Sequence, residues 1–331
     1  HNVLFGYHYN EQEYNDPEDA VADPFGAFFS ETEETRYSID YHFNIRYPET
    51  ETVRSTFTGG FEYLDEDYDQ QTRSIFLGFE TKGSLEEDRD NWGWYAQEQL
   101  SFFNRLHLTA GALYEYNSEF GNEFVPRGSV EYELTQTGTV FRGAAGKGFK
   151  AATFTEQFAQ GFATGNPDLD PEKSYSWEVG VDQVLWKNQL VLGATYFYQK
   201  FDDLITFINR PDPLPDFENI QEAESQGIEL MALCKPGYGF TFGGNYTYLD
   251  TEVKDDGGVG GPSSPFEEGK DLLRRPEHTV SGYVNWAWKG FQIRFDGSYV
   301  SERDDLDFRA FPADRVTLDE YFIVDLATSY T

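Results

Sequence analysis

Several residue types are scarce in this chain of 331 residues, and each scarcity excludes a class of chemistry. A single cysteine, Cys234, rules out an internal disulfide, and no histidine motif lies near it to activate the thiol. The five histidines are scattered, and the sequence contains neither a phosphate-binding loop nor a G-x-S-x-G nucleophile motif. We therefore expect no catalytic centre, and the protein is predicted not to be an enzyme.

Basic residues and long apolar runs are scarce as well. The chain has 25 Lys and Arg against 59 Asp and Glu, which gives a formal net charge of −34. This balance excludes nucleic acid as a partner, because binding to phosphates needs a basic surface. No apolar run approaches the roughly 18 residues of a transmembrane helix. A membrane β-barrel remains compatible with the sequence, since it carries its apolar residues at every second position.

What the chain does have is aromatic residues, 18% of the total, and a clear alternation of apolar and polar side chains. Between residues 173 and 183, Tyr175, Trp177 and Val179 alternate with polar neighbours, as in a strand with one apolar and one polar face. The same pattern predicts about fourteen strands along the chain. They span residues 1–10, 36–46, 52–64, 91–103, 105–117, 123–135, 139–147, 173–186, 189–201, 218–234, 239–250, 276–289, 291–302 and 320–331.

Short and long connections alternate between these strands. Tight turns are predicted at 47–51, 104, 136–138, 187–188, 235–238 and 290. The other connections, most of them long, are 11–35, 65–90, 118–122, 148–172, 202–217, 251–275 and 303–319. A strand-like run at 74–80 falls inside one of them, where we interpret it as a strand extension. This sorting predicts an all-β fold, a transmembrane antiparallel up-and-down β-barrel with periplasmic turns, extracellular loops and aromatic girdles near the strand ends.

The polar face of each strand is predicted to face the lumen, where water or polar protein surrounds it. The charged residues that we place there are Glu98, Glu115, Glu131, Glu178, Asp182 and Arg294. A soluble β-protein with an aromatic core is the competing interpretation, and it does not explain why the connections sort by length.

Three blocks of sequence resemble the barrel of TonB-dependent outer-membrane receptors. The first contains GKGFKA at 146–151, GNPDL at 165–169 and WEVG at 177–180, with Ala152 where the family usually has proline. The second is NIQEAESQGIEL at 219–230, and the third is LLRRP at 272–276. Among these receptors, the compact loops and the third block are most similar to those of the cobalamin-receptor type.

The resemblance implies that residues 1–331 form part of a barrel of about 22 strands, and that a plug domain, early strands and last strands lie outside them. It implies a monomeric receptor in the outer membrane of a Gram-negative bacterium, surrounded by lipid and lipopolysaccharide. Such a receptor takes up a scarce nutrient, cobalamin or a ferric siderophore, with energy delivered by TonB through the plug. In receptors of this family, the substrate lies between the extracellular loops and the plug.

Two sets of loop residues are candidates for a site. Aromatic and polar residues in the predicted loops are the expected substrate contacts, namely Phe158, Phe162, Asn166, Phe207 and Asn209. Carboxylates are concentrated in the two early loops, and those we expect to bind metal are Asp16, Asp19, Asp65, Glu66, Asp67 and Asp69. Calcium prefers six to eight oxygen ligands, so such stretches are candidates for Ca²⁺. The competing interpretation is a solvated acidic surface.

Other functions remain open at this point. A passive, porin-like outer-membrane channel would close its fourteen strands on themselves and would need no plug. A barrel enzyme would need a histidine, an acid and a serine at one rim, and His42 or His107 would be its candidates. A structural or adhesive surface barrel would show no uptake phenotype.

Overall fold

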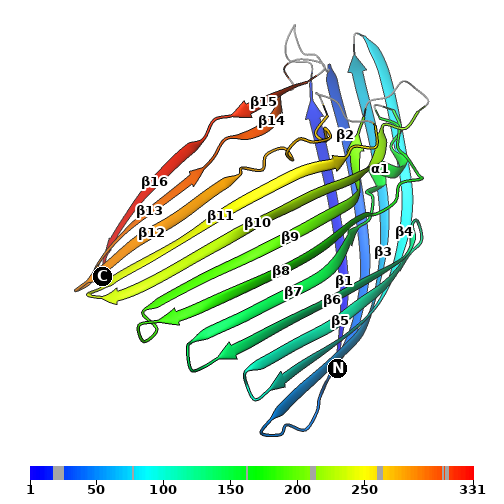
Figure 1. Cartoon of the computed structure of the whole chain (residues 1–331). Helices are drawn as coiled ribbons and strands as arrows, with labels where there is room; N and C mark the ends of the chain where they lie inside the picture. The colour runs from blue at the N-terminus through cyan, green and yellow to red at the C-terminus, as the bar shows by residue number, and fades with distance from the viewer. Residues whose placement is uncertain are drawn as a thin grey trace.

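The computed structural model describes residues 1–17, 26–76, 78–161, 163–208, 214–258, 264–307, 309 and 313–331. Its main feature is one antiparallel sheet of fourteen strands, in which β1 to β13 and then β16 lie side by side in chain order (Figure 1). The sheet contains β1 (Asn2–Asp16), β2 (Ala27–Arg46), β3 (Val53–Phe76), β4 (Phe79–Phe102), β5 (Leu106–Asn117), β6 (Gly121–Leu134), β7 (Thr139–Lys150), β8 (Glu172–Leu185), β9 (Leu190–Phe207), β10 (Phe217–Gly237), β11 (Phe240–Asp255), β12 (His278–Trp288), β13 (Phe291–Val300) and β16 (Tyr321–Tyr330). The predicted number and order of strands are confirmed.

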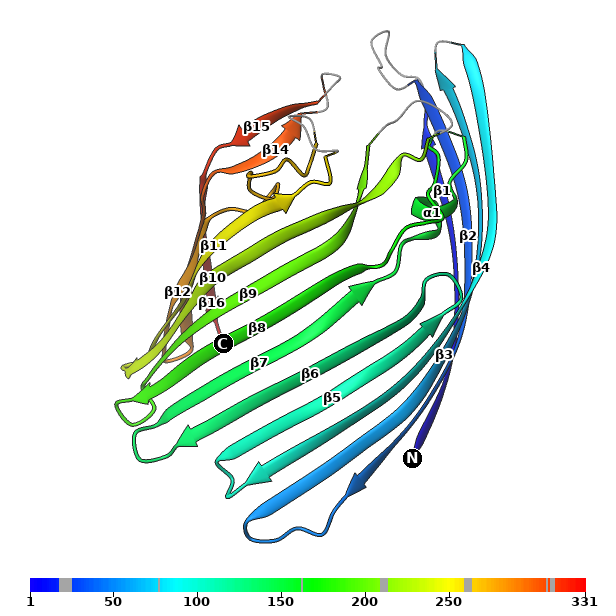
Figure 2. The same cartoon turned by 45° about the vertical axis from the view of Figure 1, so that its right-hand side comes forward.

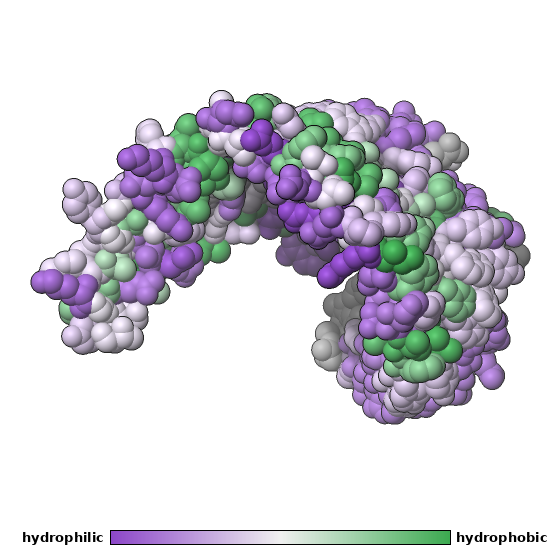
Figure 3. Space-filling model, turned by 90° about the horizontal axis from the view of Figure 1, so that it is seen from below, coloured by the Kyte–Doolittle hydropathy of each residue, from purple (hydrophilic) through white to green (hydrophobic). Residues whose placement is uncertain are grey.

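The sheet curls into part of a barrel. Seen from below, it forms an arc with an open side (Figure 3). Within the described residues, β1 pairs only with β2 and β16 pairs only with β13, so the sheet keeps two edges. The short helix α1 (Phe154–Phe158) contacts β3 and β4 inside the curve (Figure 2), and we call that side of the sheet the concave face.

Alternation along each strand separates the residues of the two faces. The convex face carries exposed aromatic and aliphatic side chains that continue from strand to strand through the register, as Trp177 does beside Tyr198. The concave face carries mostly polar side chains, such as Gln97 on β4 and Glu229 on β10. An apolar convex face and a polar concave face are the arrangement of a membrane barrel.

Short turns gather at one end of the sheet and longer connections at the other (Figure 1). Two of the turns contain only two residues, Tyr238–Gly239 and Lys289–Gly290, and all four of these residues have positive φ. This conformation matches the twist of the flanking antiparallel strands and therefore closes tight hairpins. The predicted sorting of connections is confirmed, with the exception of the connection between β3 and β4, which contains only two residues.

The predicted loops 11–35 and 65–90 are wrong, because β1 to β4 continue through them. β3 and β4 each contain 24 residues, about twice the length that crosses a membrane, so their upper halves stand above it. The run at 74–80 belongs largely to these strands, as the interpretation of a strand extension requires. Acidic residues obscured the pattern, since the face that is apolar lower down becomes charged where the strands leave the membrane.

Two further elements stand at the upper end. The predicted loop 303–319 contains a separate hairpin of β14 (Arg303–Asp307) and β15 (Asp314–Leu318), which the alternation did not reveal because its strands have five residues each. Helix α1 begins at a capping box, in which Thr153 accepts from the Glu156 amide and Glu156 accepts from the Thr153 amide. No helix within the described ranges is long and apolar enough to span a membrane.

The assignment of faces can be tested with two residues of β8. We expect Val181→Arg, on the convex face, to destabilise the barrel in lipid by about 2–4 kcal/mol, because it puts a charge into the hydrocarbon region. Glu178→Arg, on the concave face, is the matched control and should change stability by much less. Folding into lipid vesicles, followed by the shift of the folded form in electrophoresis, measures both. Equal losses in the two variants would contradict the assignment.

Candidate functional site

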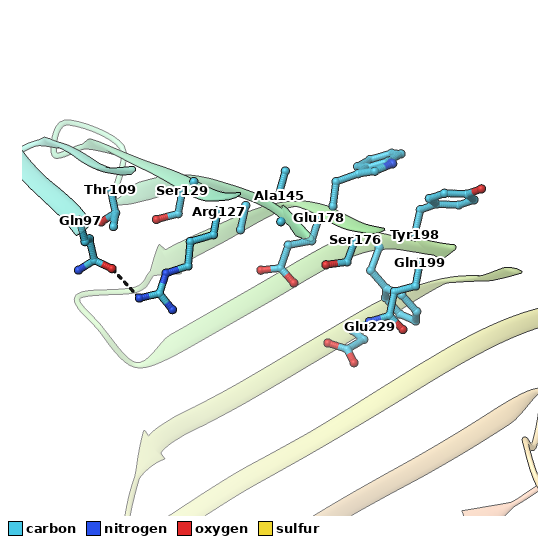
Figure 4. A pocket seen from close by; sticks show the side chains of 15 residues that line it. Gln97, Thr109, Arg127, Ser129, Ala145, Ser176, Glu178, Tyr198, Gln199 and Glu229 are labelled. Carbon is cyan, nitrogen blue, oxygen red and sulfur yellow. Dashed lines mark hydrogen bonds between the residues drawn. The ribbon is translucent and has the colours of Figure 1, made fainter. Parts of the chain in front are cut away.

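The concave wall has a broad pocket of about 780 Å³ that extends from β4 to β10 (Figure 4). Arg127 on β6 and Gln97 on β4 lie at one side of it, and the Arg127 guanidinium donates to the Gln97 side-chain oxygen at 2.8 Å. Glu178 and Glu229 lie toward the other side, where the described residues offer their carboxylates neither a hydrogen bond nor an ion pair. The pocket therefore presents one cation and two unpaired anions to the interior.

Two other groups of charges on this wall are paired. Asp182 lies 3.3 Å from the Arg142 guanidinium, which also donates to the Thr195 hydroxyl at 2.8 Å. Arg294 holds Asp296 with bonds of 2.7 to 3.0 Å and lies over the ring of Tyr283. These pairs stiffen the wall between β7 and β13.

Five of the six residues predicted to face the lumen share the concave face. The register places Glu115 and Glu131 with Gln97 and Arg127, and Glu178, Asp182 and Arg294 follow on later strands. Glu98 was predicted wrongly. It directly follows Gln97, which is on the concave face, and lies four residues after Trp94, which is on the convex face. Glu98 therefore lies on the convex face, where the Ser55 hydroxyl donates to its carboxylate. The prediction placed Glu98 in the lumen because its side chain is charged. On the convex face, however, a serine of the neighbouring strand supplies a hydrogen bond to this carboxylate.

The connection between β7 and β8 turns into the curve and is fastened to β3 and β4. Arg89 donates to the Ala152 carbonyl at 2.9 Å, pairs with Glu66 at 2.9 Å, and lies 4.5 Å from the ring centre of Phe154. Tyr68 stacks on the same ring. The Arg89 and Glu66 side chains are only 10% and 5% exposed, so this ion pair is shielded from water. Sequence reasoning missed Arg89 because it lies in a stretch interpreted as a loop.

The remainder of this connection is held by polar residues of the run at 165–172, whose hydrogen bonds fold the loop. Asn166 donates to the Phe217 carbonyl at 3.0 Å and accepts from the Asp168 amide at 3.1 Å. Glu172 accepts from the Ile205 amide at 3.0 Å, so the loop returns to the sheet beside the upper end of β9.

The residues predicted to contact substrate are partly brought together. Phe207 packs edge-on against Phe217, the residue that Asn166 binds, so these two predicted residues are near neighbours. Phe158 is half-buried at the end of α1, some distance along the same loop. Phe162 and Asn209 lie outside the described residues. No bound substrate tests any of the five, and they remain predictions.

A second group of loops is joined by arginines. Arg274, in the LLRRP run, bonds to Asp305 at 2.8 Å, and Arg315 on β15 lies 3.1 Å from Asp304 and 3.7 Å from Glu267. The Leu306 amide and the Arg274 guanidinium hold the pKa of Asp305 below its usual range. Residues 264–276 are thereby tied to the β14–β15 hairpin, so both loops form one extracellular unit.

Of the six carboxylates predicted to bind metal, the five within the described residues do not converge. Asp65, Asp67 and Asp69 follow one another on the convex face of β3, whereas Glu66 points to the concave side and pairs with Arg89. Residues two apart on a strand are separated by more than 6 Å, too far for one calcium ion to hold three in a row. Asp16 is exposed at the end of β1, and Asp19 lies outside the described residues.

Two other groups of acids do come close enough to share an ion. The ligand atoms of each group lie within 4.8 Å of one another. The groups are Glu11, Glu31 and Glu33 on the convex face of β1 and β2, and Asp255, Asp256 and Glu268 in the connection between β11 and β12. The sequence could not single them out, because they are assembled across strands and across a loop.

His42, one of the two histidines considered for a barrel enzyme, has the wrong partners. His42 bonds to Asp40 at 2.7 Å, as a catalytic histidine would. Its other ring nitrogen, however, lies 2.9 Å from the side-chain amide nitrogen of Asn2 rather than a serine hydroxyl. The Asp40–His42 pair therefore has no nucleophile within reach among the described residues.

Comparison with known proteins agrees with this architecture. A model of the family "TonB dependent receptor-like, beta-barrel" matches residues 1–331. The vitamin B12 transporter BtuB of Vibrio cholerae is 26% identical over 276 residues, which cover 83% of this chain and 40% of the relative. The siderophore receptor PirA of Acinetobacter baumannii superposes with a TM-score of 0.71 at 14% identity, over 99% of this chain and 53% of that one. The unliganded ferric citrate transporter FecA superposes with a TM-score of 0.71 at 12% identity, over 99% and 51%.

The fold and the polar inner wall define a β-barrel of the bacterial outer membrane. The chain belongs to the TonB-dependent receptor family, as its resemblance predicted, and these are proteins of the Gram-negative outer membrane. The chain spans 40% of the length of the vitamin B12 transporter that it matches.

Removing Arg89 tests whether it fastens the β7–β8 connection. We expect Arg89→Met to lower the free energy of unfolding by on the order of 3 kcal/mol, because it leaves Glu66 buried with less compensation. Hydrogen exchange of residues 153–159 should accelerate. Arg89→Met combined with Glu66→Gln should recover part of the loss. Arg36→Met is the control, since Arg36 also pairs with Glu66 but is 44% exposed and should cost less than 1 kcal/mol. Equal effects at the two arginines would refute the anchoring role.

Proposed function

We propose that this chain is the larger part of a barrel whose complete protein is an outer-membrane receptor for a scarce nutrient, either cobalamin or a ferric siderophore. Uptake through it is driven by TonB. Membership of the family supports this, as do the relatives named for vitamin B12 and ferric citrate transport. The relatives are receptors and transporters, which agrees with a protein that performs no chemistry of its own.

The observation that carries the proposal is the concave wall around Arg127, Glu178 and Glu229. Its charges are incompletely paired within the described residues, and they face the interior of the barrel. A plug domain elsewhere in the protein would supply polar partners for them, and TonB would act on that plug. In this arrangement the convex aromatic band contacts lipid and lipopolysaccharide, and the receptor works as a monomer.

A passive channel made of these fourteen strands alone is the alternative. Such a channel would have to join β1 to β16, but within the described residues each of these strands pairs on one side only. Open edges in hydrocarbon leave backbone groups unbonded, which costs several kcal/mol for each group. Additional strands would satisfy this requirement, as in the 22-stranded barrel that the resemblance implies.

Uptake in cells tests the receptor function directly. We expect deletion of the gene to abolish high-affinity uptake of radiolabelled cobalamin or of one ferric siderophore. Deletion of tonB should have the same effect, because the energy for transport arrives through TonB. The control is a strain in which the gene is restored on a plasmid. Uptake that persists at low substrate concentration without TonB would point to a passive channel instead.

We also propose that extracellular carboxylates bind Ca²⁺ and thereby order the upper strands. The group of Glu11, Glu31 and Glu33 supports this better than the residues chosen from the sequence, because its oxygens lie close together.

Calorimetry of chelator-treated protein provides the test. Calcium should bind with a measurable heat, and Glu33→Gln should weaken binding by on the order of tenfold through the loss of one charged ligand. Glu34→Gln is the matched control, since this neighbour lies on the other face and pairs with Arg36. A titration without heat would rule out the calcium proposal.

A further inference from the structure

The upper parts of β1, β2 and β3 divide their side chains sharply between the two faces. On the convex face the register aligns acids of all three strands, for example Glu11 with Glu33 and Glu33 with Asp69. On the concave face, Gln12 aligns with Thr32 and Thr32 with Gln70. A single sheet thus carries anions on one side and neutral amides and hydroxyls on the other.

A pocket of about 400 Å³ lies on that neutral side, between the strands and the loop that carries α1. Amide and hydroxyl side chains make up most of its lining, and Tyr14, Phe28 and Tyr68 add aromatic surface. No lysine or arginine lines it among the described residues, and its single acid, Glu34, is neutralised by Arg36. In a chain with a net charge of −34, this is an unusually uncharged surface.

Part of this polar lining is already hydrogen-bonded, and the other part is available for a ligand. Gln70 donates to the Thr32 hydroxyl at 3.1 Å, and the Tyr68 and Thr155 hydroxyls lie 3.4 Å apart. The side-chain amides of Asn10, Gln12 and Gln160 make no hydrogen bond with any described residue. Free amides beside aromatic rings suit a ligand that combines hydrogen-bonding groups with an apolar surface.

Electrostatics limits the charge of that ligand. The carboxylates of the convex face are only one sheet thickness away, which is within the Debye length of about 8–10 Å at physiological salt. Their field opposes an approaching anion, and the described lining of the pocket has no unpaired cation to compensate. A polyanionic ligand is therefore excluded, and a neutral one is not.

We propose that this pocket binds a neutral ligand, or a neutral part of a larger one, that bears several amide or hydroxyl groups. This assignment rests on the proposed uptake function, because the pocket opens on the concave side, along the route of an entering nutrient. A corrinoid with amide side chains and a neutral oligosaccharide share this chemistry. Ferric citrate, which is anionic, does not.

Titration of the full-length protein in detergent tests the pocket without transport. The probes are cyanocobalamin, maltohexaose and ferric citrate. We expect one of the two neutral probes to bind, and ferric citrate not to bind. Gln12→Ala and Gln70→Ala should each raise the Kd about fivefold, the factor that a hydrogen bond between neutral groups provides. The neutral probe that binds identifies the source of the ligand.

Gln71→Ala is the matched control. Gln71 is the next residue of β3, but it lies on the convex face with Glu31 and Arg73, so its loss should leave the Kd unchanged. Binding of a neutral probe that is indifferent to Gln12 and Gln70 would overturn the proposal, as would the failure of both neutral probes to bind at millimolar concentration. If TonB-dependent uptake continues in those cases, the receptor function stands without the pocket. If binding depends on Gln70 but uptake does not depend on TonB, the pocket stands and the receptor function fails.

Discussion

The ladder of backbone hydrogen bonds between adjacent strands is the constraint on which the rest of this structure depends. In hydrocarbon no water can replace a missing partner, so each membrane-spanning strand must bond to a neighbour on both sides. The simplest way to meet this demand is to pair each strand with the next one in the sequence, as β1 to β13 do. Where a turn has only two residues, as between β10 and β11 and between β12 and β13, it also fixes the register, because it leaves no slack between the strands.

The register then decides what each face presents. Because side chains alternate, two adjacent residues such as Gln97 and Glu98 contact different media. The same rule applies above the membrane, where it separates the acids of β1 to β4 from the neutral residues behind them. The large negative charge of the protein is therefore not spread evenly. In the upper parts of β1 to β3 the acids lie mainly on the outside, and the inner side carries mainly neutral residues.

The extracellular loops are fixed to one another and to the strands by a few arginines. Arg89 joins the β7–β8 connection to β3 and β4, and Arg274 and Arg315 join two later loops. Such ties reduce the number of conformations that the loops adopt before a ligand arrives, and binding then costs less conformational entropy. A receptor for a scarce nutrient benefits from this preorganisation, because the ligand has to be captured at low concentration.

The sequence by itself determined the class of fold, the number of membrane strands and the sorting of the turns, because alternation and turn residues are local signals. It also assigned Glu115, Glu131, Glu178, Asp182 and Arg294 to one side of the sheet, and the register puts these five on the concave face, since a strand's own pattern shows which residues share a face. The family was predicted from short motifs, such as GNPDL at 165–169 and LLRRP at 272–276, whose residue spacing depends on the turns that they form.

Only the tertiary structure decided which residues meet across strands. The acids at 65–69 formed a cluster in the sequence, but the strand divided them between two faces and gave Glu66 to Arg89. The acids that do converge, Glu11, Glu31 and Glu33, come from two strands whose register no local pattern reveals. The long upper strands escaped prediction for the same reason. They are held by pairing with each other and by the loop that carries α1, and these contacts join residues far apart in the chain.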